Sequence, residues 1–300
     1  MEIKRKVVCT STGCIEYAPD RYKQLGIDII RIHVLFKGKE YLEGLDLDPD
    51  AFYKDLETLE DPKNNLPRTA MPTEDEIKAC FDRAYEEGCK EVIVISLSAY
   101  LGGTWNLIRL ISEQYQDKMT IHVIDSKIAC FGEGMLAIKA AEMVQKGIPT
   151  ETILKEIAWM MNHQEFVGVD ARLDYLIYNG RLKGGKAFMG KMLNICPVVH
   201  FTHEGEIVAL QSVRTPKKAL ARSCEVVKEL IGDRDPKDYL LWHTYTGTSL
   251  LEDLVEIEKK YDLQTNHEKV ITSPVSGCHN GPWLAGYGLL FLRRDDEPLE

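Results

Sequence analysis

The chain lacks several features that would assign it to a common functional class. Lys and Arg total 37 against 47 Asp and Glu, which gives a formal net charge of −10 at pH 7, and no dense basic stripe interrupts this balance. A phosphate backbone binds to concentrated positive charge, so we expect no nucleic acid partner. No apolar run approaches the roughly 20 residues that span a bilayer, so we expect no stable membrane insertion.

Signals of export and of disulfide bonding are also missing. The first ten residues are charged but are not followed by the apolar segment of about 7–15 residues that a signal peptide contains, so we expect a cytoplasmic protein. The eight cysteines include no C-x-x-C pair. In a chain of this length without an export signal, they are interpreted as reduced core thiols.

Familiar catalytic and metal-binding signatures are absent as well. The sequence contains no G-x-x-x-x-G-K-[ST], no G-x-G-x-x-G after a strand, no H-E-x-x-H and no G-x-S-x-G, which disfavours kinase or dehydrogenase activity in this chain. His200, His203 and Glu204 lie close together in sequence. Residues three apart on a strand face opposite sides, however, so we expect no metal site there.

The chain does contain 44% apolar residues, enough for one large core or two medium ones. In the first half, strand-like and helix-like segments alternate in the order that builds a parallel sheet covered by helices. We expect strands over 6–10, 27–37, 91–97 and 120–125, and helices over 48–58, 73–85 and 104–116. The stretch 61–71, which holds two prolines and two asparagines, is expected to be a loop.

The second half has a different pattern, with mixed strand pairing. We expect helices over 151–162 and 215–231, short helices around 180–190, a hairpin of 195–201 with 207–213, and strands over 165–169, 239–244 and 269–272. This pattern predicts an α/β protein with an N-terminal parallel-sheet domain, residues 1–160, and a second, α+β domain, residues 161–300. Residues 276–288 are expected to form a loop that returns to the cleft between the domains.

Three loops follow strands at their carboxyl ends, where α/β proteins hold ligands because helix N-termini present unpaired N–H groups there. The loops contain Ser11 and Thr12; Ser98, Gly103 and Thr104; and Asp125 and Ser126. Hydroxyls, and glycines that let the backbone approach closely, suit an anion. Ordinary helix capping by Ser and Thr explains any one of the loops equally well.

Two further residues lie in glycine-bounded turns. His279 is in the segment Gly277–Pro282, which we expect to be a tight loop, and Arg181 follows Gly180. Taken alone, such a histidine is usually structural and such an arginine is usually an ordinary surface residue. The functional interpretation depends on these positions occurring together with the three loops.

In order and over nearly the whole chain, these positions resemble the DegV family, which includes bacterial fatty-acid-binding proteins that serve a fatty acid kinase. The likeness is carried by the Ser11-Thr12 loop, Tyr41-x-x-Gly44-x-Asp46, Pro67-x-Thr69-x-x-Pro72-Thr73, Ser98-x-x-Leu101-x-Gly103-Thr104, Val123-Ile124-Asp125-Ser126, Leu173-x-Tyr175-Leu176-x-x-x-Gly180-Arg181, Arg214-Thr215-x-Lys217-Lys218-Ala219 and Gly277-x-His279-x-Gly281-Pro282.

The resemblance implies a two-domain fold with a long-chain fatty acid bound between the domains and no other cofactor. Its carboxylate would be held by Thr69, Ser98 and His279, with Arg181 nearby. The supporting loops would supply Ser11, Thr12, Gly103, Thr104, Asp125, Ser126 and Gly281. A carboxylate only accepts hydrogen bonds, and hydroxyls, an imidazole and a guanidinium are donors. The protein would present the acid to a separate kinase for acyl-phosphate formation and would not be an enzyme itself.

The sequence departs from the family pattern near this site. Thr10 stands where the family commonly has an acid, Ala99 and Gly102 where it has serine, and Trp283 where it has glycine. A tryptophan there is expected to narrow the acyl tunnel or cover its mouth. Cys9, Cys196 and Cys278 lie in or beside the ligand loops and become candidate linings of the tunnel or cleft.

Two other functions remain open from the sequence. One is a serine-type hydrolase in which Ser98 is the nucleophile and His279 the base, although the acid partner is unassigned. The other is a sensor of a small anion on the same scaffold, suggested by Thr10 and Trp283. Turnover of activated esters would distinguish the first from a carrier, and stabilisation by a small polar anion would distinguish the second.

Overall fold

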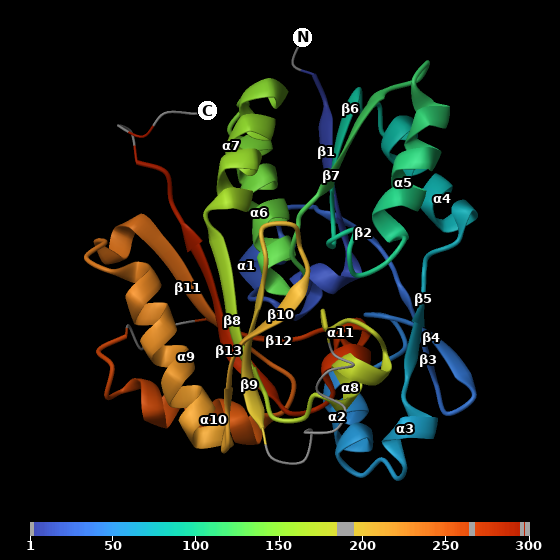
Figure 1. Cartoon of the computed structure of the whole chain (residues 1–300). Helices are drawn as coiled ribbons and strands as arrows, with labels where there is room; N and C mark the ends of the chain where they lie inside the picture. Colours follow the sequence, from blue (N-terminus) through green and yellow to red (C-terminus); the bar gives the residue numbers. More distant parts are fainter. Residues whose placement is uncertain (1–2, 185–194, 264–267, 295–296, 298–300) are drawn as a thin grey trace.

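In a computed structural model of the chain, which describes residues 3–184, 195–263, 268–294 and 297, the first sheet is fully parallel (Figure 1). Its order is β2 (Asp28–Ile30), β1 (Arg5–Thr10), β6 (Glu91–Ser96) and β7 (Thr120–Asp125). Five of the six β6 residues are buried, as expected for a strand covered on both faces. Helices α4 (Glu74–Glu86) and α5 (Thr104–Ser112) pack on one face and α6 (Phe131–Gln145) on the other.

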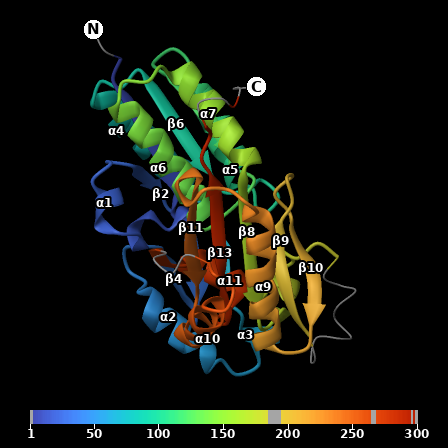
Figure 2. The same cartoon turned by 90° about the vertical axis from the view of Figure 1, so that its left-hand side faces the viewer.

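The second sheet is mixed. Its order is β10 (Ile207–Val213), β9 (Cys196–Phe201), β8 (Gln164–Asp170), β13 (Leu284–Phe291), β11 (Tyr239–Tyr245) and β12 (Glu268–Ile271), with β11–β12 the one parallel pair among them. Helices α9 (Pro216–Ile231) and α10 (Thr248–Glu258) cover one face, and Figure 2 shows α9 lying along the strands. The predicted fold class, α/β with a parallel sheet followed by a mixed-sheet region, is confirmed.

A small antiparallel sheet completes the strands: β4 (Lys39–Leu42), β3 (His33–Phe36) and β5 (Arg68–Ala70). The turn from β3 to β4 holds Lys37 at φ 49° and Gly38 at φ 73°, and two successive positive φ values match the right-handed twist of a hairpin. The remaining helices are α1 (Asp20–Lys23), α2 (Pro49–Glu57), α3 (Pro62–Asn65), α7 (Thr150–Asn162), α8 (Asp174–Tyr178) and α11 (Pro274–Asn280).

Three sequence predictions of local structure were wrong. The single strand expected over 27–37 is two strands, because the chain leaves the first sheet after β2 and enters the small sheet at β3. The loop expected over 61–71 contains α3 and β5, and β5 is a strand only because it pairs with β3. The loop expected over 276–288 is most of α11 followed by the first half of β13. The short helices expected near 180–190 fall largely outside the described residues.

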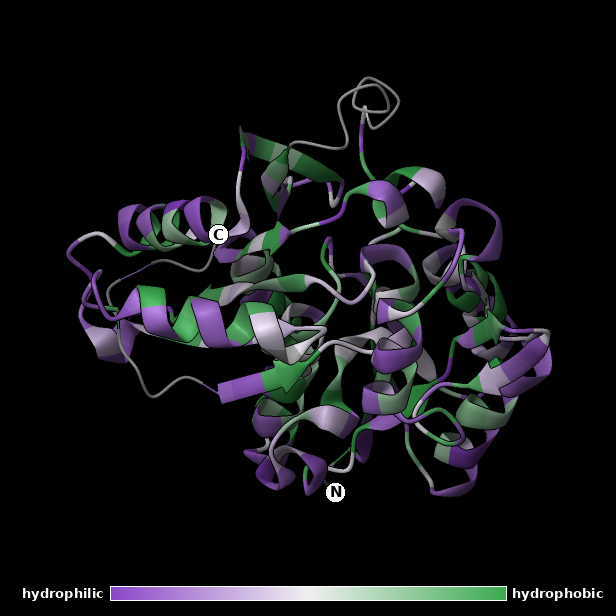
Figure 3. Cartoon of the chain, turned by 90° about the horizontal axis from the view of Figure 1, so that it is seen from below, coloured by the Kyte–Doolittle hydropathy of each residue, from purple (hydrophilic) through white to green (hydrophobic). Residues whose placement is uncertain are grey.

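Apolar side chains are concentrated between these layers. Figure 3 shows helices at the periphery that alternate hydrophilic and hydrophobic residues, as helices with one buried face do. The strands of the first sheet come from residues 5–125 and those of the second from 164–291, on either side of the boundary predicted at 160. All eight cysteines are buried and free. None of the described helices has the length and hydropathy that crossing a membrane requires.

Candidate functional site

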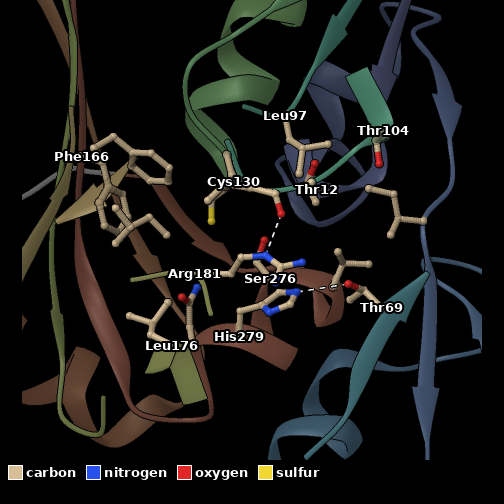
Figure 4. Close-up of a pocket in the computed structure, with 18 of the residues that line it drawn as sticks. Thr12, Thr69, Leu97, Thr104, Cys130, Phe166, Leu176, Arg181, Ser276 and His279 are labelled. Atoms are coloured by element: carbon tan, nitrogen blue, oxygen red, sulfur yellow. Dashed lines mark hydrogen bonds between the residues drawn. The ribbon is translucent and has the colours of Figure 1, made fainter. Parts of the chain in front are cut away.

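A cavity of about 140 Å³ is lined by residues from all three sheets (Figure 4). The small sheet contributes β5, the first sheet contributes the loop after β6, and the second sheet contributes β8, β9, β10 and β13. Most of the lining is apolar, including Ile32, Leu97, Leu101, Phe166, Leu176, Val199, Phe201, Ile207 and Leu284. Such a lining excludes water and favours a hydrophobic ligand.

Polar side chains gather at one side of this cavity. Thr69 on β5 and His279 in the last turn of α11 lie with Thr69 Oγ1 3.2 Å from His279 Nε2, and Figure 4 shows Arg181 beside them. The other ring nitrogen, Nδ1 of His279, is buried and has no hydrogen-bond partner within the described residues. A buried polar atom without a partner at a cavity is suited to a ligand.

The turn after α8 positions Arg181. Gly180 adopts φ +68°. Its N–H donates to the carbonyl oxygen of Ile177, and the N–H of Arg181 donates to the carbonyl oxygen of Leu176. These two hydrogen bonds are those of a Schellman motif at a helix C-terminus. The Arg181 Nε then donates to the Leu101 carbonyl at 2.7 Å. The turn after α8 and the loop after β6 thus hold the Arg181 guanidinium at the cavity.

The charge state of this polar group follows from its surroundings. Burial, and then the positive charge of Arg181, lower the pKa of His279 to about 3, so its imidazole is neutral at physiological pH. Burial also lowers the pKa of Arg181, but an arginine stays protonated. Within the described part of the chain no carboxylate forms an ion pair with Arg181. The cavity therefore presents a positive charge for which the described residues supply no counter-ion.

Ser98 lies elsewhere. Its side chain is fully buried, donates to the carbonyl of Gly205 at 2.8 Å and accepts from the N–H of Tyr100 at 3.2 Å. It is not among the residues that line the cavity, and His279 Nε2 faces Thr69 instead. The structure therefore brings together Thr69, His279 and Arg181, and it uses Ser98 to join the β9–β10 turn to the loop after β6.

The supporting residues divide in the same way. Thr12, Gly103 and Thr104 line the cavity. The other four supporting residues make contacts around the cavity. The Ser11 hydroxyl accepts from the N–H of Ile32, and the Ser126 hydroxyl donates to the carbonyl of Ile128. The Asp125 carboxylate accepts from the N–H of Ala99 and pairs with Lys127, and Gly281, at φ +67°, packs on Tyr175.

The departures from the family pattern have specific environments. The hydroxyls of Thr10 and Thr12 both donate to Glu133 of α6, whose side chain is fully buried. Burial raises the pKa of Glu133 to about 8, so a neutral carboxylic acid stands behind the Thr12 turn. Gly102 lines the cavity. Trp283 does not: its ring packs under the guanidinium of Arg172 at 4.9 Å, so the expected narrowing of the tunnel was wrong.

Sequence reasoning also named the wrong cysteines as linings. Cys9 contacts Glu133, Cys196 lies near the Ala171 carbonyl and Cys278 near that of Arg68, whereas Cys130, at the start of α6, lines the cavity. Ser276 and the aromatic residues Phe166 and Phe201 were also missed. No sequence signal distinguishes these from core residues, because a hydrophobic lining and a hydrophobic core have the same composition. Within the described ranges, no group of three His, Cys, Asp or Glu side chains could hold a metal ion.

Sheets on both sides of an apolar cavity, with a cationic group at one side of it, define an α/β protein whose cavity suits an amphiphilic anion. The chain belongs to the DegV family: the family model described as "Uncharacterised protein, DegV family" matches residues 4–292. The predicted resemblance is thereby confirmed.

Individual relatives agree with this assignment. The chain is 32% identical over 298 residues to a DegV domain-containing protein of Listeria innocua, covering 95% of this chain and 98% of the relative. Among solved structures, it is similar to a fatty acid binding DegV family protein of Streptococcus agalactiae, with a TM-score of 0.86, 28% identity, and coverage of 97% and 100%. It is also similar to DegV, a fatty acid binding protein from Bacillus subtilis, with a TM-score of 0.81, 27% identity, and coverage of 96% and 99%.

Proposed function

We propose that the protein is a fatty-acid carrier that holds an acid between two domains, residues 1–160 and 161–300. The acyl chain occupies the apolar cavity, and the carboxylate lies against Thr69, His279 and Arg181. The observation that carries this proposal is the arginine at the cavity that no carboxylate of the described chain neutralises. The two solved relatives named above, both described as fatty acid binding proteins, support it.

The chemistry of the polar group suits a carboxylate. A carboxylate accepts hydrogen bonds only, and Arg181 supplies a guanidinium. The neutral His279 and Thr69 share one hydrogen bond, so this pair supplies one further donor. That donor is His279 Nδ1–H, which has no partner among the described residues, when Thr69 donates to Nε2. Hydrogen bonds to a charged group contribute about 1.5–3 kcal/mol each. Each methylene buried in the cavity adds about 0.8 kcal/mol. In this proposal Ser98 is a positioning residue, because it holds the loop whose Leu101 carbonyl orients Arg181.

The proposal includes a separate kinase in the cytoplasm that phosphorylates the bound carboxylate. Thr69 and Arg181 are partly exposed, and Met71, two residues after Thr69, is 49% exposed, so the carboxylate end of the cavity is open to a second protein. The chain itself contains no phosphate-binding loop motif. An acyl phosphate formed at that end would leave the acyl chain in place.

The proposal is tested by native mass spectrometry of protein purified from cells and by thermal unfolding. We expect about one equivalent of fatty acid, and a rise in the midpoint of unfolding when stripped protein receives oleate or palmitate. The matching fatty alcohol, which has the same chain without the charge, should stabilise less, and acetate or phosphate should have no effect. Protein that carries no acid and is not stabilised by added acid contradicts the proposal, and stabilisation by a small anion alone supports a sensor.

The alternative hypothesis, a serine hydrolase that uses Ser98 and His279, is tested by a separate assay. We expect no turnover of activated esters, because the Ser98 hydroxyl is bonded to Gly205 and not to His279. Turnover that Ser98→Ala abolishes would establish the hydrolase instead.

A further inference from the structure

A second cavity, of about 210 Å³, lies beside the first, and two aromatic rings separate them. Phe166 on β8 and Phe201 on β9 line both cavities. Their rings meet edge to face, with centroids 5.6 Å apart and planes at 83°. In Figure 4, Phe166 lies across the cavity from Thr69 and His279. The ring pair therefore stands at the side of the cavity away from the polar group.

The two rings bound the first cavity on the side away from the polar group. An acyl chain that starts at the polar group therefore meets the rings once it is long enough to cross the cavity.

The second cavity offers space for the rest of such a chain. Its apolar lining beyond the two rings is Ile128 and Met161. Polar side chains complete it: Lys127, Gln164, Glu165, His200, Thr202, His203 and Glu204. A chain that passes between the rings would reach Ile128 and Met161 with its methyl end.

Resting on the proposed function, we infer that Phe166 and Phe201 form the end wall of the acyl cavity and determine chain-length specificity. Acids whose chains end before the rings bind in front of the wall. Longer acids bind only by displacing the two rings and entering the second cavity. Packing between the two rings opposes that displacement, so the methylenes beyond the wall add little affinity.

The test is a series of dissociation constants for saturated acids of 8 to 20 carbons, measured on stripped protein by calorimetry below their micelle concentrations. In front of the wall, affinity should rise about fourfold per methylene, the equivalent of about 0.8 kcal/mol. We expect this rise to stop, in the natural protein, at the chain length that reaches the rings. Phe201→Ala, which removes one ring and joins the cavities, should continue the rise to longer acids than in the natural protein.

Phe291→Ala is the matched control, because Phe291 is on β13 of the same sheet and lines neither cavity. It should leave the chain length of the break unchanged. Phe201→Leu is a milder variant in case the alanine variant does not fold, and it should move the break by a smaller number of carbons in the same direction. Circular dichroism confirms that each variant is folded.

The outcomes separate the two claims. A break at the same length in natural protein and in the folded Phe201 variants, or no break at all up to 20 carbons, overturns the end wall and leaves the carrier function intact. Failure of every acid to bind the natural protein overturns the carrier function and the wall with it. A break that moves to longer acids in the Phe201 variants and not in Phe291→Ala establishes the wall.

Discussion

At the scale of single residues, the most consequential side chain is Arg181, because its charge is neutralised by no carboxylate within the described chain. In Arg181→Met the apolar part of the side chain is kept and the donors are lost. We expect a loss of about 1.5–3 kcal/mol in the affinity for a fatty acid, roughly 10- to 150-fold, and little change for the matching alcohol. Competition binding with a fluorescent acid measures both.

Arg109→Met is the control for that substitution. Arg109 is an exposed arginine of α5 that pairs with Glu113 at 2.7 Å, and its loss should leave both affinities unchanged. Equal losses for the acid and the alcohol in Arg181→Met would show that the arginine contributes by packing and not by charge.

Glu133 makes stability depend on pH. Its pKa is about 8 in the fold because it is buried, against an ordinary value of 4.5. Between these two pKa values the folded state binds more protons than the unfolded state, so the free energy of unfolding falls as the pH rises. The stabilisation that protonated Glu133 provides is fully present below about pH 4.5 and is lost as the pH rises through about 8. Glu133→Gln should make the free energy of unfolding fall less steeply over that range, as measured by urea denaturation at pH 5, 6.5 and 8.

Glu142→Gln, on the same helix, is the comparison for Glu133. Its carboxylate is partly exposed and lies 2.9 Å from Lys139, so this variant measures the effect of removing an acid from α6 at a position that is not buried. An unchanged slope in Glu133→Gln would show that Glu133 is ionised in the fold.

The residues of the site were predictable in part. Thr69, His279 and Arg181 were named from sequence, and the structure brings them together at one cavity; that they hold a carboxylate remains a prediction. Ser98 follows its strand as a ligand-binding serine would. Its hydroxyl is used by Gly205, which lies 107 positions away, and no local pattern shows such a contact.

At the scale of elements, the turn that ends α8 is open to a direct test. Gly180 has φ +68° and open space where a Cβ would be added, so Gly180→Ala adds backbone strain alone, roughly 1–2 kcal/mol. We expect lower stability and also weaker fatty acid binding, because the turn orients Arg181. Gly26→Ala provides a matched comparison, since Gly26 has φ +67° and equally open space; it should lose similar stability and keep its affinity. Equal fatty acid affinities in Gly180→Ala and Gly26→Ala would show that the turn after α8 does not affect binding.

Elements with strong local signals were predicted well, and those that depend on tertiary pairing were not. The capping box of Thr73 and Glu76 begins α4 as expected, and β7 has the predicted bounds. Helix α11 has seven residues with Gly277 in its interior, so its local propensity is low, although Pro274 at its first position suits a helix start. It is stabilised by Ser273 at its N-terminus and by burial of most of its residues.

At the scale of the whole molecule, the β9–β10 turn joins the two large sheets. Gly205 has φ +92°, and an added Cβ would lie 2.2 Å from Ser98 Oγ and 3.0 Å from the Cα of Lys127. Gly205→Ala should therefore push the turn away from the first sheet, lowering the midpoint of thermal unfolding by several degrees and weakening fatty acid binding. Gly38→Ala, in a turn with open space at φ +73°, is the control and should change stability only. Unchanged affinity in a folded Gly205→Ala would show that this contact does not shape the cavity.

The unneutralised charge of Arg181 has a consequence for the lifetime of the protein. In the proposed carrier, the bound acid is the counter-ion that the described residues do not supply. At a free acid concentration 100 times the dissociation constant, binding adds about 2.7 kcal/mol to stability. Proteases act on the unfolded fraction, so empty molecules would be degraded first. The abundance of the carrier would then follow the supply of its cargo without a dedicated regulator.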